Sequence, residues 1–272
     1  PDRIEGGIAR LAEAMVARGE LTADDRDGLR TTTLALEPAS PALGAEHFVT
    51  YIRETAPYRL SEHGVLPTTL DGALQRNVQQ LLDARIAQLA RKQVHNGAAL
   101  VVDHTTGEIL AWVVAGAGSD ATPAGAIDAV RAPRQPGSSM KPFLYALALD
   151  SGWSPATLLD DSPMAEAIGG GLHDFHNYSH TFYGKLTLRE ALGNSLNIPA
   201  LLTIQFVTPA RYLDTLHRLG FQSLSQSADF YRDGLALGNG EVSLLEMVQA
   251  YATLANRGAL RPLTPLAHAH EA

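Results

Sequence analysis

The sequence feature that most constrains the fold is an apolar helix pattern, from Ser138 to Leu149, that carries a single charge at Lys141. Ser138, Lys141 and Tyr145 share one face of this helix, because residues three and four apart are helical neighbours. The opposite face is apolar at helical spacing. It consists of Met140, Phe143, Leu144, Leu147 and Ala148. The pattern predicts a core helix whose first turn brings a serine and a lysine together.

This pairing suits nucleophilic chemistry at Ser138. A serine hydroxyl is nearly inert at neutral pH and needs a base within hydrogen-bond reach. An apolar environment disfavours the charged form of a lysine, so the pKa of Lys141 is expected to fall until the amine can act as that base. The alternative is a core helix whose lysine extends to solvent. Ser-x-x-Lys is common by chance, so the motif needs partners elsewhere in the chain.

Composition limits the kind of partner. The 272 residues are 45% hydrophobic and 18% charged, as in ordinary globular proteins. The net charge is −8 and no block of Lys or Arg occurs, so nucleic acid is not an expected partner. The chain has no cysteine, which fits the cell envelope and excludes disulfides. No apolar run approaches the ~18 residues of a membrane span, and the opening at Pro-Asp-Arg predicts an excised fragment.

The first hundred residues predict helices followed by a hairpin. Residues 1–62 form a helical segment without recognisable chemistry, and residues 63–96 hold a connecting helix from an N-cap at Asp71 to about Lys92. Strands are expected at 98–103 and 108–114 around a four-residue turn. Two strands are too few for a stable sheet, for which three or more are expected.

The remaining sequence predicts a long polar excursion and then a series of helices. Residues 152–186 are rich in Gly, Asp, His, Asn and Pro, and a surface loop of that length is expected to be functional. Helices are predicted to begin at the capping boxes Thr187–Glu190 and Ser243–Glu246, and also at Pro199 and Thr208. The fold class is therefore α+β.

Three long segments resemble the transpeptidase domain of class A (bifunctional) penicillin-binding proteins, closest to the 1C type. They are Arg134–Tyr145 with Ser-x-x-Lys, Gly184–Ala200 with Ser-x-Asn, and Gly238–Gly258. The resemblance covers roughly residues 66–265. It implies the fold shared by penicillin-binding proteins and serine β-lactamases, in which a helical cluster packs against an antiparallel sheet. It also implies that residues 1–62 are the tail of a missing glycosyltransferase domain, and that 97–272 is the N-terminal part of the transpeptidase domain.

One part of the family pattern is absent from this sequence. The third motif, Lys-Thr-Gly, lies in the family on the strand that flanks the pocket, and it does not occur before Ala272. That strand supplies one of two oxyanion donors, each worth about 10²–10³ in rate. The chain is therefore expected to be truncated before this strand and to be inactive or impaired.

The resemblance assigns a role to each matched residue. Ser138 would attack the D-Ala–D-Ala carbonyl of a stem peptide, and Lys141 would accept the serine proton. Ser195 would relay a proton to the leaving amine, and Asn197 would orient Lys141 and the substrate amide. An amine from a neighbouring stem peptide would then resolve the acyl-enzyme. On spacing alone, Ser195 and Asn197 could equally cap the following helix.

Substrate contacts are expected from Asn177, Tyr178 and Ser139, and neither a cofactor nor a metal is expected. Stem peptides and β-lactams are the implied ligands, and other cell-wall synthesis proteins are further implied partners. The implied location is the periplasmic side of the bacterial inner membrane, with an anchor absent from this chain. The two tryptophans, Trp112 and Trp153, are predicted to be packing residues.

Three alternatives remain open on sequence. His173, His176 and His180 lie close enough in the chain to suggest a metal site, although no helix or hairpin is evident to bring them together. A D,D-carboxypeptidase or serine β-lactamase would use the same serine and lysine, with water resolving the acyl-enzyme. A non-catalytic scaffold in an envelope complex is the third, favoured only by the missing motif.

Overall fold

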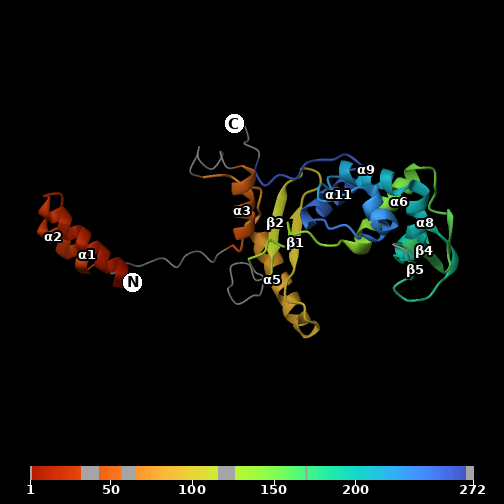
Figure 1. Cartoon of the computed structure of the whole chain (residues 1–272). Helices are drawn as coiled ribbons and strands as arrows, with labels where there is room; N and C mark the ends of the chain where they lie inside the picture. The colour runs from red at the N-terminus through yellow and green to blue at the C-terminus, as the bar shows by residue number, and fades with distance from the viewer. Residues whose placement is uncertain (1, 32–42, 57–64, 116–125, 169–170, 268–272) are drawn as a thin grey trace. The chain divides into compact units, whose positions relative to one another are not determined.

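The computed structural model describes residues 2–31, 43–56, 65–115, 126–168 and 171–267. Contacts divide the chain into two compact units, Pro1–Ala42 and Leu43–Ala272. Within its described residues, the first unit contains the helices α1 (Asp2–Ala17) and α2 (Ala23–Thr31). Thr22 precedes α2 and accepts a hydrogen bond from the backbone N–H of Asp25 at 3.2 Å, which satisfies one donor of the first turn. All other elements belong to the second unit (Figure 1).

A hairpin with helices packed against it forms one end of the second unit. Its elements are α3 (Glu46–Thr55), α5 (Gly72–Leu89), the 3₁₀ turn η1 (Ala90–Lys92), β1 (Ala98–Val102) and β2 (Ile109–Val114). The predicted N-cap is confirmed, because Asp71 accepts hydrogen bonds from the first turn of α5. The side chain of Gln75, which is fully buried, bonds both the N–H and the carbonyl of Trp112 at 2.8 Å and so fixes α5 on β2.

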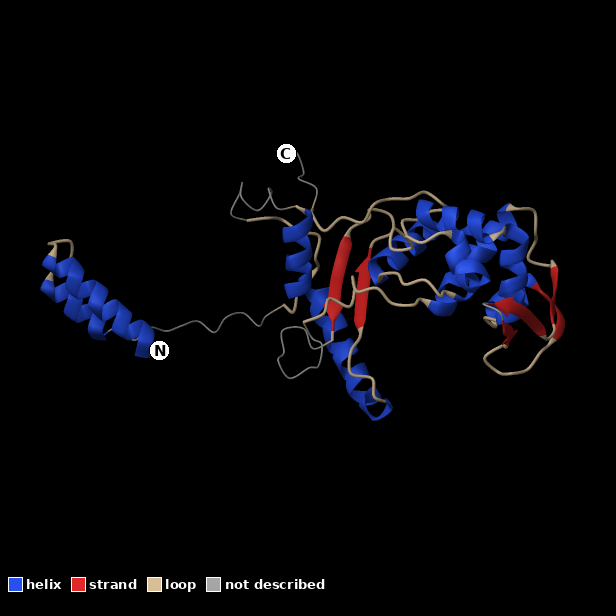
Figure 2. Ribbon diagram, in the orientation of Figure 1, coloured by secondary structure: helices blue, strands red, loops and turns tan. Residues whose placement is uncertain are grey.

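The hairpin is stabilised by helices rather than by further described strands. Trp112 is 1% exposed and packs with Phe48 and Ile52 of α3, so its predicted packing role is confirmed. Leu244 and Leu245, from the C-terminal helix, pack against the same cluster. Figure 2 shows the hairpin between α3 and α5 on one side and the helical cluster on the other. An isolated hairpin is marginal in water, and packing against helices supplies the missing burial.

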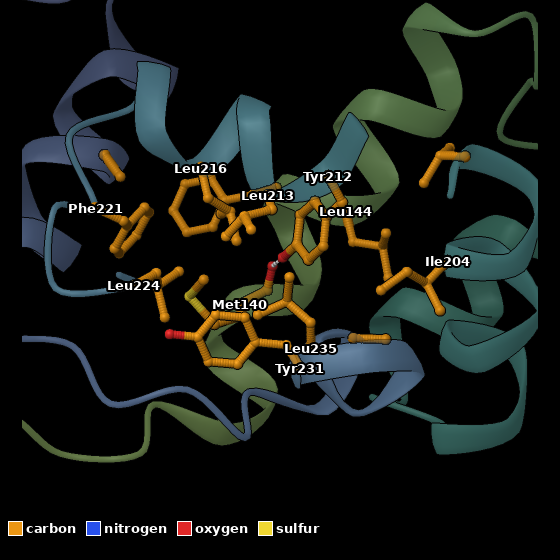
Figure 3. Packing of buried hydrophobic residues seen from close by; sticks show 14 of the residues in the cluster. Met140, Leu144, Ile204, Tyr212, Leu213, Leu216, Phe221, Leu224, Tyr231 and Leu235 are labelled. Atoms are coloured by element: carbon orange, nitrogen blue, oxygen red, sulfur yellow. Dashed lines mark hydrogen bonds between the residues drawn. The ribbon is translucent and has the colours of Figure 1, made fainter. Parts of the chain in front are cut away.

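The helical cluster surrounds α6. Its elements are η2 (Gly137–Met140), α6 (Lys141–Asp150), α7 (Leu188–Gly193), α8 (Asn197–Val207), α9 (Pro209–Arg218), α10 (Ala228–Tyr231), η3 (Arg232–Leu237) and α11 (Leu244–Ala255). Both predicted capping boxes, at the starts of α7 and α11, are confirmed. The apolar face of α6 packs in the cluster of Figure 3. The opposite face is buried as well, because Tyr145 packs against Leu159, Leu188 and Ala191.

The polar excursion contains strands, so the interpretation of residues 152–186 as a loop is wrong. Its elements are β3 (Leu158–Asp161), β4 (Met164–Ile168), β5 (Gly171–Phe175) and β6 (Gly184–Thr187). β3 pairs with β6 and β4 with β5, both antiparallel. These strands are too short and too polar to give a period-2 signal. With the hairpin they make three two-stranded sheets in the described part of the chain, and the α+β class is confirmed.

The division between the two compact units lies between Ala42 and Leu43. The helix α3 belongs to the second unit, where its Phe48 and Ile52 pack on the hairpin. Within the ranges described, no helix has both the length and the apolar character needed to cross a membrane.

Candidate active site

The turn from Pro136 to Met140 carries the predicted nucleophile. Ser138 lies exposed in η2, directly before α6, and Pro142 occupies the first turn of α6, where its missing N–H costs nothing. The turn rests on Gly238, whose φ is +74°. A Cβ built on Gly238 would lie 2.5 Å from the nitrogen of Gly137, so only glycine permits this contact between two backbones.

Two tyrosines hold the carbonyl groups that follow the serine. Tyr212 of α9 donates to the carbonyl of Met140 at 2.8 Å (Figure 3), and Tyr251 of α11 donates to that of Ser139 at 2.8 Å. Burial raises the pKa of both phenols, so both remain protonated donors near neutral pH. These two bonds attach the turn to α9 and α11.

Lys141 is buried at the start of α6. Its side chain is the only lysine in the core of the described residues and is 1% exposed, which excludes the alternative of a lysine extending to solvent. The amine donates to the carbonyl of Ser195 at 2.6 Å and to Oδ1 of Asn197 at 2.8 Å, and its distance to Oγ of Ser195 is 3.4 Å. Burial lowers the pKa of Lys141 to about 8.

The Ser-x-Asn segment lies in the break between α7 and α8. Ser195 has φ of +54°, a left-handed conformation that is uncommon for serine and that directs its carbonyl to the lysine. Asn197 uses its side-chain nitrogen to donate to the carbonyl of His176 at 2.8 Å. Leu196 is the N-cap of α8 and no side chain caps that helix. The capping alternative for Ser195 and Asn197 is therefore wrong.

The structure brings Lys141, Ser195 and Asn197 into direct contact and places Ser138 one turn before the amine. Among the described residues, no hydrogen bond joins the hydroxyl of Ser138 to that amine, whose donors are directed to Ser195 and Asn197. The site therefore combines the exposed hydroxyl of Ser138 with the buried amine of Lys141, one helical turn later. Such an amine loses its proton more readily than a solvated one, which is the requirement for a base.

The three predicted substrate-binding residues have different environments. Asn177 is 2% exposed and both polar atoms of its side chain are hydrogen-bonded within the protein, so that side chain supports the site and is not available to a substrate. Tyr178, the next residue, is fully exposed. The hydroxyl of Ser139 donates to the carbonyl of Pro136 at 2.6 Å.

Ser139 lies beside an apolar groove rather than among the Lys141 contacts. The groove has a volume of about 550 Å³ and runs between the end of β1, the segment before η2, and α11. Tyr251 and Met247 line it together with Ser139 and Val242. On a 3₁₀ turn, neighbouring side chains point about 120° apart, which separates Ser139 from the site of its neighbour Ser138.

Sequence reasoning missed Asp161, Tyr212, Tyr251 and the contact of Gly238. Asp161 is fully buried and its carboxylate accepts two hydrogen bonds from Asn177. An aspartate in a polar segment gives no sequence signal for burial. The Gly-Asn-Gly run at 238–240 indicates a turn, but nothing in the sequence shows that Gly238 contacts Gly137, about a hundred residues earlier.

The predicted histidine cluster does not assemble a metal site in the described part of the structure. The rings of His176 and His180 lie 5.4 Å apart, and the side chain of His173 lies outside the described residues. No group of three or more His, Cys, Asp or Glu side chains that could hold a metal ion is found among the residues described.

Trp153 stacks on Phe206 with ring centroids 4.4 Å apart, which confirms its packing role.

A family model described as "Penicillin binding protein transpeptidase domain" matches residues 97–270, well over half of the chain. The chain belongs to this family. It contains the two motifs, Ser138 to Lys141 and Ser195 to Asn197, that meet at the buried amine. The resemblance seen in the sequence is thereby confirmed.

Among curated relatives, penicillin-binding protein 1C of Escherichia coli K12 is 30% identical over 259 residues, 95% of this chain and 32% of that protein. Penicillin-binding protein 1A of Pseudomonas aeruginosa is 36% identical over 132 residues, 48% of this chain and 16% of that protein. The chain thus spans about a third or less of the length of these relatives.

Solved structures of family members show the same fold. Penicillin-binding protein 1A from Haemophilus influenzae aligns with a TM-score of 0.71 and 20% identity, covering 97% of this chain and 54% of that one. PonA1 from Mycobacterium tuberculosis in complex with penicillin V aligns with a TM-score of 0.62 and 25% identity, covering 81% of this chain and 59% of that one.

Proposed function

We propose that this chain is the serine-bearing part of a peptidoglycan D,D-transpeptidase that is acylated at Ser138 by stem peptides and by β-lactams. The observation that supports this most directly is the buried amine of Lys141, which Ser195 and Asn197 hold one turn after an exposed serine. A buried, polar-tethered lysine has a high desolvation cost. A lysine buried at this cost to stability is expected to have a functional role, here the transfer of a proton.

The proposed reaction begins with proton transfer at the serine. The neutral amine of Lys141 accepts the Ser138 proton as the oxygen attacks the penultimate D-Ala carbonyl. Collapse of the tetrahedral intermediate breaks the peptide bond, and Ser195, 3.4 Å from the amine, relays the proton to the departing D-Ala. The amine of a second stem peptide then attacks the ester carbonyl. The bond to the Ser138 oxygen breaks, the proton lost by the amine returns to that oxygen through Lys141, and the new amide is the cross-link. No cofactor takes part in the proposal.

The family relationship supports the wider organisation that we propose. Residues 97–272 would form the N-terminal part of the transpeptidase domain, residues 63–96 a connecting helix, and residues 1–62 the tail of a glycosyltransferase domain. Its curated relatives are penicillin-binding proteins, so the expected setting is the periplasmic side of the inner membrane. The PonA1 structure, which contains penicillin V, supports β-lactams as ligands. Tyr178, fully exposed beside the site, remains our candidate for a substrate contact.

Labelling with a fluorescent penicillin, followed by mass spectrometry of the peptide that holds the adduct, tests the proposed function. We expect the adduct on Ser138 and its loss in Ser138→Ala. Ser225→Ala is the control, because that serine is exposed and lies outside both motifs, so its loss should leave labelling intact. An adduct elsewhere, or equal labelling of Ser138→Ala, would overturn the proposal.

The resolving step separates transfer from hydrolysis. With a D-Ala–D-Ala donor, an added amine should increase product formation and appear in the product if the chain supports transpeptidation. Release of free acid at a rate independent of the amine would instead assign a carboxypeptidase.

A further inference from the structure

Asp161 is a buried carboxylate that the proposed mechanism does not use. It is the last residue of β3 and is fully buried. Its oxygens accept hydrogen bonds from the Asn177 amide at 2.9 and 2.8 Å and from the backbone N–H of Tyr183 at 2.9 Å. In the described part of the chain it forms no ion pair with a cationic side chain. A buried anion is costly unless something compensates it.

A chain of hydrogen bonds leads from Asp161 to the active-site lysine. The Asn177 nitrogen donates to Asp161, and the Asn177 oxygen accepts from the backbone N–H of Asn197 at 2.8 Å. The side-chain oxygen of Asn197 then accepts from the amine of Lys141 at 2.8 Å. The orientation of the Asn177 amide is fixed by its partners, because a backbone N–H can only meet the oxygen and a carboxylate only the nitrogen.

These hydrogen bonds connect the buried carboxylate to the buried amine. Asp161 lies at one end and Lys141 at the other, and the amide of Asn177 is aligned with its positive end toward the anion. The two bonds of the Asn177 amide polarise and strengthen one another, and they fix the backbone of Asn197, whose side chain accepts from Lys141. In a medium of low effective dielectric, opposite charges also stabilise each other over longer distances than in water. Asp161 can therefore act on Lys141 without touching it.

We propose that Asp161 is a positioning residue for Lys141: through Asn177 it fixes Asn197 against the amine, and its negative charge stabilises the ammonium form. The inference rests on the proposed function in one respect: the effect of Asp161 on Lys141 matters for catalysis only if Lys141 is the base. It assigns β3, a strand outside both sequence motifs, a direct part in setting the state of the base.

Few other ionisable groups face Lys141 from the elements packed around it. Tyr145 of α6 and Tyr212 of α9 are buried phenols; burial raises the pKa of both, and in Tyr145 the charge of Asp161 adds to that effect. His176 offers Asn197 its backbone carbonyl. The remaining charged side chains on adjoining elements are partly or fully exposed: Asp150 on α6, Arg189 and Glu190 on α7, Arg211, Asp214, His217 and Arg218 on α9, and Arg232 and Asp233 on η3.

The test is a titration of the lysine amines by NMR in the 272-residue chain. The sequence has only three lysines, and the other two, Lys92 and Lys185, are exposed and serve as internal references. Asp161→Asn should lower the titration midpoint of Lys141 by roughly 0.5–1 pH unit, less than the 1–3 units produced by an anion in direct contact. The matched control is Asp160→Asn, which removes the neighbouring exposed carboxylate of the same strand and should shift the midpoint by far less.

An unchanged Lys141 midpoint in a folded Asp161→Asn chain would overturn the proposal, and so would an equal shift in Asp160→Asn. If Asp161→Asn does not fold, Asn177→Ser is the second variant, because it removes the link between Asp161 and Asn197. Asn177→Ser must then lower the Lys141 midpoint, and an unchanged midpoint overturns the proposal. None of these readouts depends on penicillin labelling. A chain that fails to label but shows the predicted shift would refute the proposed function alone.

Discussion

The helix α6 and the strands β3 to β6 supply two sides of the same site, and different forces build them. Phe143 and Leu144 of α6 are buried among apolar side chains, so hydrophobic packing fixes the helix that carries Lys141. In the strand excursion, buried polar groups hold one another: Asp161 and Asn177 have exposures of 0% and 2%. The site thus depends on a core that tolerates substitution and on a polar network that does not.

The difference matters because the two regions meet at one amine. Apolar packing is non-directional and can adjust to a lost methyl group. A buried polar network loses a full desolvation penalty when one partner is removed. We therefore expect polar substitutions around Lys141 to affect chemistry more than apolar substitutions of similar size in α6.

The largest expected effect is the loss of the amine itself. Lys141→Met keeps an unbranched side chain, one atom shorter, and removes its proton chemistry, so the rate of penicillin labelling should fall by about 10²–10⁴. The initial rate of adduct formation measures this. Lys185→Met is the control, because Lys185 is exposed on β6 and its loss should not alter labelling. Similar rates for Lys141→Met and the unsubstituted chain would mean that the amine is not the base.

The second prediction tests the backbone contact beneath the nucleophile. Gly238→Ala and Gly184→Ala both place alanine at a positive φ, +74° and +69°, which costs about 1–2 kcal/mol in each. Only Gly238→Ala also drives a Cβ to 2.7 Å from Cα of Gly137. Thermal unfolding should therefore show a clearly larger destabilisation for Gly238→Ala, together with lost labelling of Ser138. Equal destabilisation of the two variants would show that the turn at Gly137 can move away from the new Cβ at no cost in stability.

The third prediction concerns pH. Burial lowers the pKa of Lys141 from 10.5 to about 8, and the neutral amine is the active form. Labelling should therefore rise about tenfold per pH unit up to pH 8 and level off above it. Stability should change in the same direction: between pH 8 and 10.5 the unfolded chain binds more protons, so the free energy of unfolding increases with pH. A labelling rate that is flat between pH 6 and 8 would exclude Lys141 as the titrating base.

The sequence allowed prediction of those parts whose signal is local. Capping boxes at Thr187 and Ser243 and the pattern of α6 each lie within a few residues. The Ser-x-x-Lys and Ser-x-Asn motifs could be paired only through family resemblance, since 54 residues separate Lys141 from Ser195. The roles of Asp161 and Tyr251 could not be predicted, because they depend on partners 16 and 112 residues away. A single sequence does not indicate which distant residues will be in contact.

The smallest predicted effect separates the hydroxyl of Ser195 from its backbone. Ser195→Ala and Ser195→Gly both remove the hydroxyl, and if it relays a proton both should slow labelling by up to roughly tenfold, the value of one hydrogen bond. They differ in backbone cost, because φ of +54° is strained for alanine as for serine but free for glycine. Thermal unfolding should thus rank Ser195→Gly above Ser195→Ala, while their labelling rates agree. If glycine alone retained full labelling, the carbonyl that holds Lys141 would be the group that matters, and the relay would have to be assigned to another donor.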